Sequence, residues 1–516
     1  MKKRRLEMSF RLKEEMQSSI ISKSLGYFTK LTAYSNGSYI KELNEFSARG
    51  HKNLKSYRRA QIGDIDIEVH AIAANNKVRH IKKDWGIFFT PQWVVDFMVN
   101  LIDERNLNTD SVKILEPACG ICQFLMGIKK NKKHIFENAL DKIGVEINEE
   151  VIEYIHEHGL AQNIRIIHYD YLLWNTDEHF DVIIGNPPYG IPSLSEHYKI
   201  RVDNETKKKY KETYETWYGK YNVYGAFIEK SIKLLKDNGQ LIFIVPATFM
   251  ILDEFRKLRN FLATHGKTEI VYMGNNVFKP EAKVATVILR FIKSKSEENK
   301  LILYDYNNAN PKVIAKNTHW DGDIILFSTE FSRKVDHICS FKLGDIYEIK
   351  ISPRTPEIKH NTSIIETGNL SNRKNLLPIL NGRNLKIGKV IYKPLTGYWI
   401  EKEKRIYLRR FFDRPHIVVG LGFRGKGQVG AAYDYKAYPW MGDVYHLLRK
   451  HTLINTQFDL TEEEVVEYLN SKIIKKYVKD IFREITYHFN ITQLKMLPLP
   501  TKEELKELLT HTERNN

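Results

Sequence analysis

The chain has 516 residues, enough for two or three domains that each bury a core of their own. Its 80 Lys and Arg residues exceed its 63 Asp and Glu residues and give a formal net charge of +17, so we expect a polyanionic partner, with nucleic acid as the first candidate. Its three cysteines are too few for a disulfide scaffold and favour a reducing compartment.

No segment predicts secretion or membrane insertion. Charged residues follow the basic start Met1–Arg5 and interrupt any apolar signal region. The longest apolar stretch, Leu241–Leu252, is short and contains Pro246. We therefore expect a cytoplasmic protein that does not bind a membrane.

Residues 1–83 are predicted to form a basic N-terminal extension. Asp64, Asp66 and Glu68 resemble the carboxylates of a nuclease, but their alternate spacing places them on one face of a strand. No lysine follows in a nuclease pattern, so a solvated strand face is the simpler interpretation. Two roles remain open for the extension, an additional contact with nucleic acid and structural packing.

Between residues 84 and 300, strands and helices alternate. The expected strands are apolar runs at 112–115, 143–145, 164–168, 182–184, 241–245 and 270–273. The expected helices lie at 91–102, 148–158, 223–236 and 253–265. This alternation predicts an α/β fold with a doubly wound, mostly parallel sheet. The run Val284–Phe291 has no helix before it, so we expect it to pair antiparallel.

Residues 301–516 are predicted to form a second domain of the α+β class. Its strands are shorter, Gly and Pro are more frequent, and basic and aromatic residues are interspersed. No low-complexity linker separates the two domains, so their junction should be compact.

The strand at 112–115 leads into the turn Glu116-Pro-Ala-Cys-Gly120. Ala118 and Gly120 belong to this turn, where glycine lets a ligand approach the backbone closely. The turn is not a G-x-G-x-x-G loop, so it predicts a site for a nucleoside without phosphates. Cys119 and Cys122 are interpreted as small side chains that fill the turn, since no further Cys or His completes a zinc site.

Acidic residues end the next two strands. Glu146 follows the strand at 143–145, where a carboxylate can accept hydrogen bonds from both hydroxyls of a ribose. Asp170 follows the strand at 164–168, where it can accept from the amino group of adenine, and Tyr171 can stack on that base. The alternative, that each carboxylate only caps the next helix, is weaker because successive strands share the pattern.

The tetrapeptide Asn186-Pro-Pro-Tyr189 follows the apolar run Asp181–Gly185, at the carboxyl end of a parallel strand. The side-chain oxygen of Asn186 and the carbonyl of Pro187 can accept both hydrogens of a planar exocyclic amine and shift its nitrogen toward tetrahedral geometry. The two prolines stiffen the turn, and Tyr189 offers a ring to a planar substrate. An ordinary proline turn is the alternative interpretation.

Together these motifs resemble the gamma class of DNA adenine-N6 methyltransferases, in particular the TaqI-like group of restriction–modification systems. The motifs occur in the order Gly86–Pro91, Glu116–Gly120, Glu146, Asp170 and Asn186–Tyr189. Residues 276–278 and 284–290 resemble the segment that lines the target-base pocket, and residues 380–385, 414–419 and 437–440 resemble the C-terminal recognition domain. The resemblance extends from about residue 85 to about residue 500.

The resemblance implies S-adenosylmethionine as the cofactor, held by Thr90, Glu116, Ala118, Gly120, Glu146, Asp170, Tyr171 and Pro187. It implies Asn186, Pro187 and Tyr189 as the catalytic residues, without a metal. Tyr189 and Phe278 are the implied stacking partners of a flipped base. The family usually has Asp at the position of Glu116 and a second Gly at the position of Cys122.

The implied function is a site-specific DNA methyltransferase that modifies N6 of a flipped adenine in double-stranded DNA, within a restriction–modification system. Contacts with DNA are expected from basic residues of the second domain, namely Arg354, Arg383, Lys386, Arg424 and Lys426. The loop Gly422–Gly427, which carries the last two, is equally compatible with a plain surface turn. We expect a monomer, and a cognate endonuclease would act on the same site without a stable complex.

Two other classes of function are compatible with parts of the sequence. A protein-glutamine N5 methyltransferase uses a similar Asn-Pro-Pro-Tyr motif but lacks a large basic C-terminal domain. A non-catalytic DNA-binding component of a restriction system is disfavoured by the intact Asn186, and the short N-terminal extension disfavours a fused nuclease.

Overall fold

The computed structural model describes residues 90–513 except 106, 108–110, 194–199, 280–281, 308–309, 367–374, 409–411, 423–427, 451–456, 484 and 487. The expected N-terminal extension at 1–83 lies outside the described residues. So do residues 86–89 of the first motif and the two basic residues Arg424 and Lys426.

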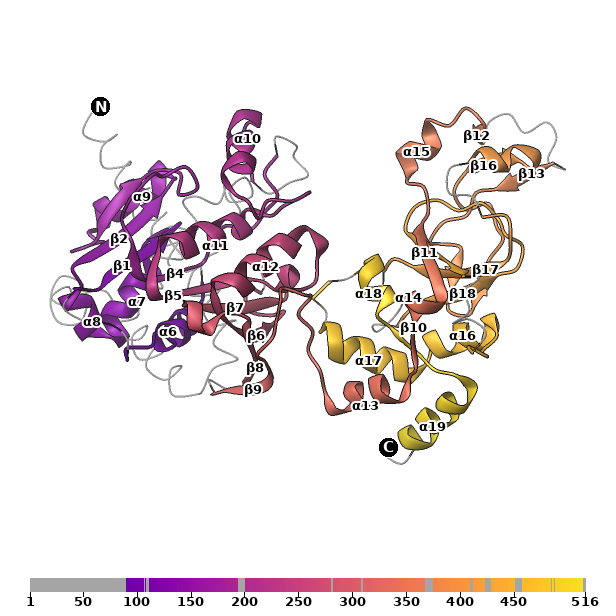
Figure 1. Cartoon of the computed structure of the whole chain (residues 1–516). Coiled ribbons are helices and arrows are strands. Elements are labelled where there is room, and N and C mark those ends of the chain that lie inside the picture. The colour runs from indigo at the N-terminus through magenta and orange to yellow at the C-terminus, as the bar shows by residue number, and fades with distance from the viewer. Residues whose placement is uncertain are drawn as a thin grey trace, which may run out of the picture. The chain divides into compact units, whose positions relative to one another are not determined.

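A large sheet forms the centre of the first domain (Figure 1). Its order is β3-β2-β1-β4-β5-β7-β6-β8-β9. The strands are β1 (Lys113–Pro117), β2 (Asp141–Glu146), β3 (Arg165–His168), β4 (Phe180–Gly185), β5 (Leu235–Pro246), β6 (Gly266–Gly274), β7 (Thr286–Lys293), β8 (Lys300–Asn307) and β9 (Asn310–Asn317). β1 to β5 pair in parallel, which confirms the predicted α/β fold. β7 pairs antiparallel with both β5 and β6, as expected from the missing helix.

Helices cover the sheet (Figure 1). They are α6 (Gln92–Asn100), α7 (Gln123–Asn131), α8 (Lys133–Asn138), α9 (Glu149–His158), α10 (Asn204–Thr213), α11 (Val223–Leu234) and α12 (Arg256–His265). α7 packs on β1, α9 on β2 and β3, α11 on β5, and α12 on β6. β4, in the interior of the sheet, is an almost continuous apolar run because a parallel sheet covered on both sides buries both faces of such a strand.

Local signals set the limits of these helices. The side chain of Asn148 accepts hydrogen bonds from the backbone of Glu150 and Val151 at the start of α9. Gly159 ends the same helix in the left-handed conformation, at φ 61°. The predicted helix at 253–265 begins as a 3₁₀ turn at Asp253–Phe255 before α12.

The central sheet extends beyond residue 300, where the first domain was expected to end. β8 pairs in parallel with β6, and β9 continues the sheet from β8. Leu301, Trp320 and Phe327 belong to the same hydrophobic core as the central strands. The expected boundary therefore falls inside the sheet, and the apolar core of the first domain continues to about residue 327.

The C-terminal residues fold around a separate core and carry antiparallel sheets, which confirms the predicted α+β class. One sheet has the order β11-β19-β17-β18, with β11 (Tyr347–Ile351), β17 (His416–Gly420), β18 (Ala431–Asp434) and β19 (Val444–Arg449). The shorter strands are β10 (Phe341–Lys342), β12 (Ile364–Glu366), β13 (Leu376–Pro378), β14 (Leu385–Lys386), β15 (Lys389–Val390), β16 (Tyr398–Glu401) and β20 (Pro498–Leu499). The helices are α13 (Glu330–Ile338), α14 (Leu343–Ile346), α15 (Thr355–Lys359), α16 (Glu462–Leu469), α17 (Lys472–Phe482), α18 (Ile491–Lys495) and α19 (Lys502–Glu513).

Within the part of the chain that the structure describes, every helix is too short or too polar to cross a bilayer.

Candidate functional site

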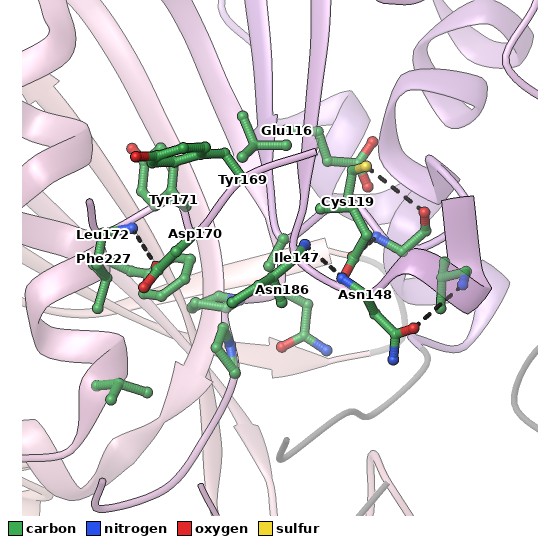
Figure 2. A pocket seen from close by; sticks show the side chains of 18 of the residues that line it. Glu116, Cys119, Ile147, Asn148, Tyr169, Asp170, Tyr171, Leu172, Asn186 and Phe227 are labelled. Atoms are coloured by element: carbon green, nitrogen blue, oxygen red, sulfur yellow. Dashed lines mark hydrogen bonds between the residues drawn. The ribbon is translucent and has the colours of Figure 1, made fainter. Parts of the chain in front are cut away.

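A cavity lies at the carboxyl ends of β1 to β4. Every residue expected to bind the cofactor lines it: Thr90, Glu116, Ala118, Gly120, Glu146, Asp170, Tyr171 and Pro187. Asn186 also lines the cavity. Figure 2 shows Asp170, Tyr171 and Phe227 on one side, Glu116 and Asn148 on the other, and Asn186 between them. The fold thus brings together residues that are spread over about a hundred positions.

The turn after β1 is wound tightly by alternate left-handed residues. Ala118, Gly120 and Cys122 have φ values of 52°, 51° and 64°. Only glycine adopts this conformation without a steric cost, so the other two residues strain the backbone. Glu146 holds the turn from the neighbouring strand, because its carboxylate accepts a hydrogen bond of 2.8 Å from the backbone N–H of Gly120.

Glu146 also binds the chain that follows β2. Its second oxygen accepts from the backbone N–H of Ile147 at 3.0 Å and of Asn148 at 2.9 Å. Burial raises the pKa of this carboxyl above its usual value, while these backbone hydrogen bonds oppose the shift. Glu146 is therefore fixed at the cavity wall as a hydrogen-bond acceptor between two strand ends.

Glu116 ends β1 and caps α7. Its carboxylate oxygens accept from the backbone N–H of Phe124 at 3.2 Å and of Leu125 at 2.9 Å. Burial, with a smaller contribution from the nearby Glu146 charge, raises the pKa of Glu116 to about 8. The side chain is thus a buried acid whose ionisation would be favoured by a cation in the cavity.

Asp170 and Tyr171 follow β3 and face the ring of Phe227 on α11. Asp170 Oδ1 accepts from the backbone N–H of Leu172 at 2.9 Å, and Oδ2 accepts from the hydroxyl of Tyr210 at 2.6 Å. The centroids of the Tyr171 and Phe227 rings are 5.0 Å apart. The Tyr171 hydroxyl is hydrogen-bonded to Ser231 Oγ at 2.9 Å, so the ring is anchored in the core and only its edge reaches the cavity.

Asn186 is the first residue after β4, and both ends of its amide are held. Its Nδ2 donates to Thr90 Oγ1 at 3.1 Å, and its Oδ1 accepts from the hydroxyl of Tyr189 at 2.5 Å. Thr90 is itself fixed, since its backbone carbonyl accepts from Gln123 Nε2 at 3.3 Å. These hydrogen bonds orient the carboxamide plane at the end of β4.

Tyr189 and Phe278 meet, but they do not present parallel faces. Both rings are buried, at 6% and 5% exposure, with centroids 6.1 Å apart and planes inclined by 72°. Tyr189 also contacts Tyr224 edge to face and donates from its hydroxyl toward Ile244 O at 2.8 Å. Two aromatic rings with no base between them prefer this edge-to-face contact. A base could therefore stack on them only after one ring moves.

Cys119 and Cys122 are buried thiols without a disulfide. Cys119 Sγ packs against β2, where a Cβ at Gly144 would meet it at 2.8 Å. Among the described residues, no group of His, Cys, Asp and Glu side chains is arranged to hold a metal ion.

The cavity residues fit S-adenosylmethionine. The hydrogen-bond donors of this cofactor are two ribose hydroxyls, an adenine amine and an ammonium group. Glu146, Asp170 and Glu116 line the cavity with carboxyl groups, which are acceptors that such donors require, and backbone hydrogen bonds hold each carboxyl group in place. The apolar rings of Tyr171 and Phe227 flank the end of the cavity where Asp170 lies.

Three of the basic residues expected to contact DNA are described, and all three are exposed: Arg354, Arg383 and Lys386. Arg354 precedes α15, and Lys386 lies in the short hairpin of β14 and β15. Arg383 is exposed, and its guanidinium donates to the carbonyl of Leu395. Buried Asn384 fixes this loop, since its Nδ2 donates to the carbonyls of Ile391 and Lys393, each at 2.7 Å.

Asn148, Phe227 and Tyr210 are among the cavity-lining residues that the sequence interpretation missed. Asn148 was treated only as the start of a helix, and Phe227 has the apolar spacing of an ordinary core residue on α11. Tyr210 had a usable signal: it is the only apolar or aromatic residue of the strongly charged segment Asn204–Thr213.

Two family models match the chain. The model described as Eco57I restriction-modification methylase matches residues 95–278, which include the residues from Glu116 to Phe278. The model described as TaqI-like C-terminal specificity domain matches residues 377–499.

Individual proteins are similar to the chain over different lengths. The type II methyltransferase M.TthHB8I of Thermus thermophilus is 38% identical over 421 residues, which cover 80% of this chain and 91% of that protein. The modification methylase CviBIII of Paramecium bursaria Chlorella virus NC1A is 31% identical over 184 residues, or 36% of this chain and 43% of that protein. Among solved structures, a DrdV–DNA complex aligns at 15% identity with a TM-score of 0.48, covering 94% of this chain and 57% of the other.

Proposed function

This chain belongs to the type II restriction–modification methyltransferases, and from this premise we propose that it transfers a methyl group to N6 of adenine at a specific site in double-stranded DNA. The observation that carries the proposal is the position of Asn186. Its carboxamide is oriented by Thr90 and Tyr189 in the wall of a cavity that three carboxylates also line. An exocyclic amine needs such an oriented acceptor, because its nitrogen lone pair is otherwise delocalised into the ring.

S-adenosylmethionine is the methyl donor, and when bound it supplies a methyl group activated by its sulfonium centre. Asp170 would hold the adenine amine, Glu146 the ribose hydroxyls and Glu116 the ammonium group. Thr90 and Pro187 line the same cavity beside Asn186. Carboxylates at these positions fix the cofactor and leave the amine acceptors of Asn186 and Pro187 for the second substrate.

The target adenine must leave the duplex before it can reach Asn186. Extrusion costs on the order of a few kcal/mol. Stacking on aromatic rings returns about 1 to 3 kcal/mol per base. Tyr189 and Phe278 supply these rings, and the edge-to-face contact between them would open to admit the base. Asn186 Oδ1 and the Pro187 carbonyl would then accept the two N6 hydrogens, so that the nitrogen lone pair becomes available without a strong base.

The second domain supports DNA as the substrate. The chain carries a formal net charge of +17, and the exposed cations Arg383 and Lys386 lie within the segment that matches a specificity domain. Phosphate contacts by such cations provide affinity, and base contacts provide sequence preference. A protein-glutamine substrate would leave this domain without a role.

Long-read sequencing of DNA from a methylation-free host that expresses the chain tests the proposal. N6-methyladenine at one recurring sequence is expected, and it should be absent when Asn186→Ala is expressed at the same level. DNA without N6-methyladenine, or with a modified cytosine at the recurring sequence, would contradict the proposal.

A further inference from the structure

Helix α10 contacts the cavity through tyrosine hydroxyls. The helix is short and strongly charged, and Tyr210 is its one buried residue, at 4% exposure. Asp203 caps its first turn by accepting from the backbone of Thr206 at 2.7 Å. The Tyr210 ring lies 6.1 Å from that of Trp217, and its hydroxyl donates to Asp170 Oδ2 at 2.6 Å. Tyr210 therefore anchors an otherwise solvated helix to a cavity residue.

A second tyrosine, directly after α10, binds the same turn. Tyr214 lies where the helix ends and has extended backbone angles, and its hydroxyl donates to the carbonyl of Leu172 at 2.5 Å. Both hydroxyls therefore bind the segment Asp170–Leu172. The two bonds differ in chemistry, because Tyr210 meets a carboxylate that faces the cavity and Tyr214 meets a backbone carbonyl.

We propose that Tyr210 is a positioning residue for the adenine of S-adenosylmethionine, because its hydroxyl fixes the carboxylate of Asp170 in the orientation that accepts the adenine amine. This inference rests on the proposed function, which places the adenine amine at Asp170. Leu172 N–H holds one carboxylate oxygen and Tyr210 holds the other, so the plane of the carboxylate is determined from both sides. Each oxygen keeps a further lone pair for the amine.

The surroundings of Tyr210 keep its hydroxyl a donor. Burial and the adjacent Asp170 carboxylate raise the pKa of Tyr210 well above its usual value. Ile200 and Val202, which precede α10, line the same cavity with apolar side chains. A hydrogen bond to a charged acceptor in such a site is stronger than one between neutral groups.

Binding of two nucleosides by the full chain tests the role. S-adenosylhomocysteine carries the adenine amine, and its hypoxanthine counterpart has an oxygen in place of that amine. Calorimetric titration gives two dissociation constants for every variant. The readout is the dissociation constant of the hypoxanthine compound divided by that of the adenine compound. Tyr210→Phe keeps the ring and removes the hydroxyl, so it should weaken binding of the adenine compound by about fivefold to twentyfold and leave the hypoxanthine compound within twofold. In methylation assays the KM for the cofactor should rise by a similar factor, and kcat should change by less than twofold.

Tyr214→Phe is the matched control. It removes the hydroxyl of an equally buried tyrosine directly after the same helix, but the lost bond goes to the Leu172 carbonyl. Tyr214→Phe should weaken binding of both nucleosides equally and leave the ratio of their dissociation constants unchanged. If Tyr210→Phe also weakens both equally, the residue only packs the helix and the inference is overturned. If Tyr210→Phe does not fold, Tyr210→Met replaces it, because methionine fills the site with an apolar side chain that has no hydrogen-bond donor. The ratio of the two dissociation constants is then measured in the methionine variant, with the same expected and contradicting outcomes.

Asp170→Ala separates the inference from the proposed function. The ratio of dissociation constants should fall to near one in this variant, and adding Tyr210→Phe should not lower it further. An unchanged ratio in Asp170→Ala would overturn the placement of the adenine and the inference with it. A lowered ratio in Asp170→Ala with an unchanged ratio in Tyr210→Phe would overturn the role of Tyr210 alone.

Discussion

The hydroxyl of Tyr189 lies 2.5 Å from Oδ1 of Asn186, the atom that the proposed mechanism assigns to the target amine. The same hydroxyl lies 2.8 Å from the carbonyl of Ile244. Tyrosine has one hydroxyl hydrogen, so it can satisfy either acceptor but not both at full strength. Burial raises the pKa of Tyr189 well above its usual value, which keeps the hydrogen in place. Arrival of a base can therefore release Asn186 Oδ1 without leaving the Tyr189 hydroxyl unpaired.

Asn186→Ala should abolish methyl transfer and spare the fold. Loss of a preorganised hydrogen-bonding group in an active site costs about 10² to 10³ in kcat. The variant should remain folded, since Tyr189 retains Ile244 O as its acceptor. Single-turnover methylation and DNA binding by gel shift would be measured together, with the surface substitution Asn131→Ala as the control. Retention of more than a tenth of the wild-type rate would remove the assigned role.

Substitution of Phe278 should affect base extrusion more than cofactor binding. Phe278→Leu retains an apolar side chain but loses the aromatic face, which is worth about 1 to 3 kcal/mol per stacked base. Phe278→Trp restores an aromatic face. The fluorescence of 2-aminopurine at the target position should therefore differ from wild type in the leucine variant and approach wild type in the tryptophan variant. Identical signals in all three proteins would mean that Phe278 does not touch the base.

Cofactor binding should strengthen as pH rises from 6 to 8. The pKa of Glu116 is raised to about 8, so its carboxyl is mostly protonated at pH 6 and must ionise to pair with an ammonium group. The dissociation constant of S-adenosylhomocysteine should then fall by up to about tenfold per pH unit below the pKa. Calorimetry on wild type and Glu116→Gln checks this, because the glutamine variant cannot titrate and should show a flatter profile.

The same ionisation affects stability in the opposite direction. Glu116 holds its proton more tightly in the folded chain than in the unfolded chain, whose pKa is near the ordinary 4.5. The free energy of unfolding therefore decreases as pH rises between about 4.5 and 8, by up to about 1.4 kcal/mol per pH unit. Without cofactor, wild type should lose stability relative to Glu116→Gln over this range. A constant difference in denaturant unfolding would show that Glu116 titrates normally.

The salt dependence of DNA binding should separate phosphate contacts from base contacts. Lys386 is exposed in the β14–β15 hairpin, and removing a phosphate contact lowers the slope of log affinity against log salt by about 1. The guanidinium of Arg383 donates to the carbonyl of Leu395, and this hydrogen bond fixes its orientation, as a contact with one particular base requires. Lys386→Ala should weaken binding to all sequences alike, and Arg383→Ala should reduce preference for the cognate site by about 1 to 3 kcal/mol. Lys133→Ala, in an exposed pair with Glu137, is the control.

The parallel sheet and the cofactor side of the cavity were predictable because each depends on a local pattern. An apolar run followed by a polar residue gives both a buried strand and the side chain at its carboxyl end, as at Glu146 and Asn186. Residues of one strand end must then meet those of the next. Tyr171 was predicted at this cavity for the same reason, whereas Thr90, which precedes α6, was implied only by the resemblance to the methyltransferase family.

The remaining features depend on contacts between segments that are distant in sequence. The relative orientation of Tyr189 and Phe278 is set by packing against Tyr224 and by a hydrogen bond to Ile244, neither of which leaves a trace in the tetrapeptide. The continuation of the sheet through β8 depends on parallel pairing with β6, a contact between segments that the apolar run of β8 alone does not specify. Tyr210 was missed because a single tyrosine among lysines is typical of a solvated helix.

The strand order divides the site into two parts that lie on opposite sides of β4. Glu116, Glu146 and Asp170 follow β1, β2 and β3, on one side of β4, whereas Phe278 follows β6 on the other side. Asn186 and Tyr189 follow β4, between these two parts. Substitutions near β5, β6 and β7 would therefore change the proposed target-base side without touching the carboxylates that follow β1, β2 and β3, so this half of the sheet is the place to redesign the pocket for a new amine.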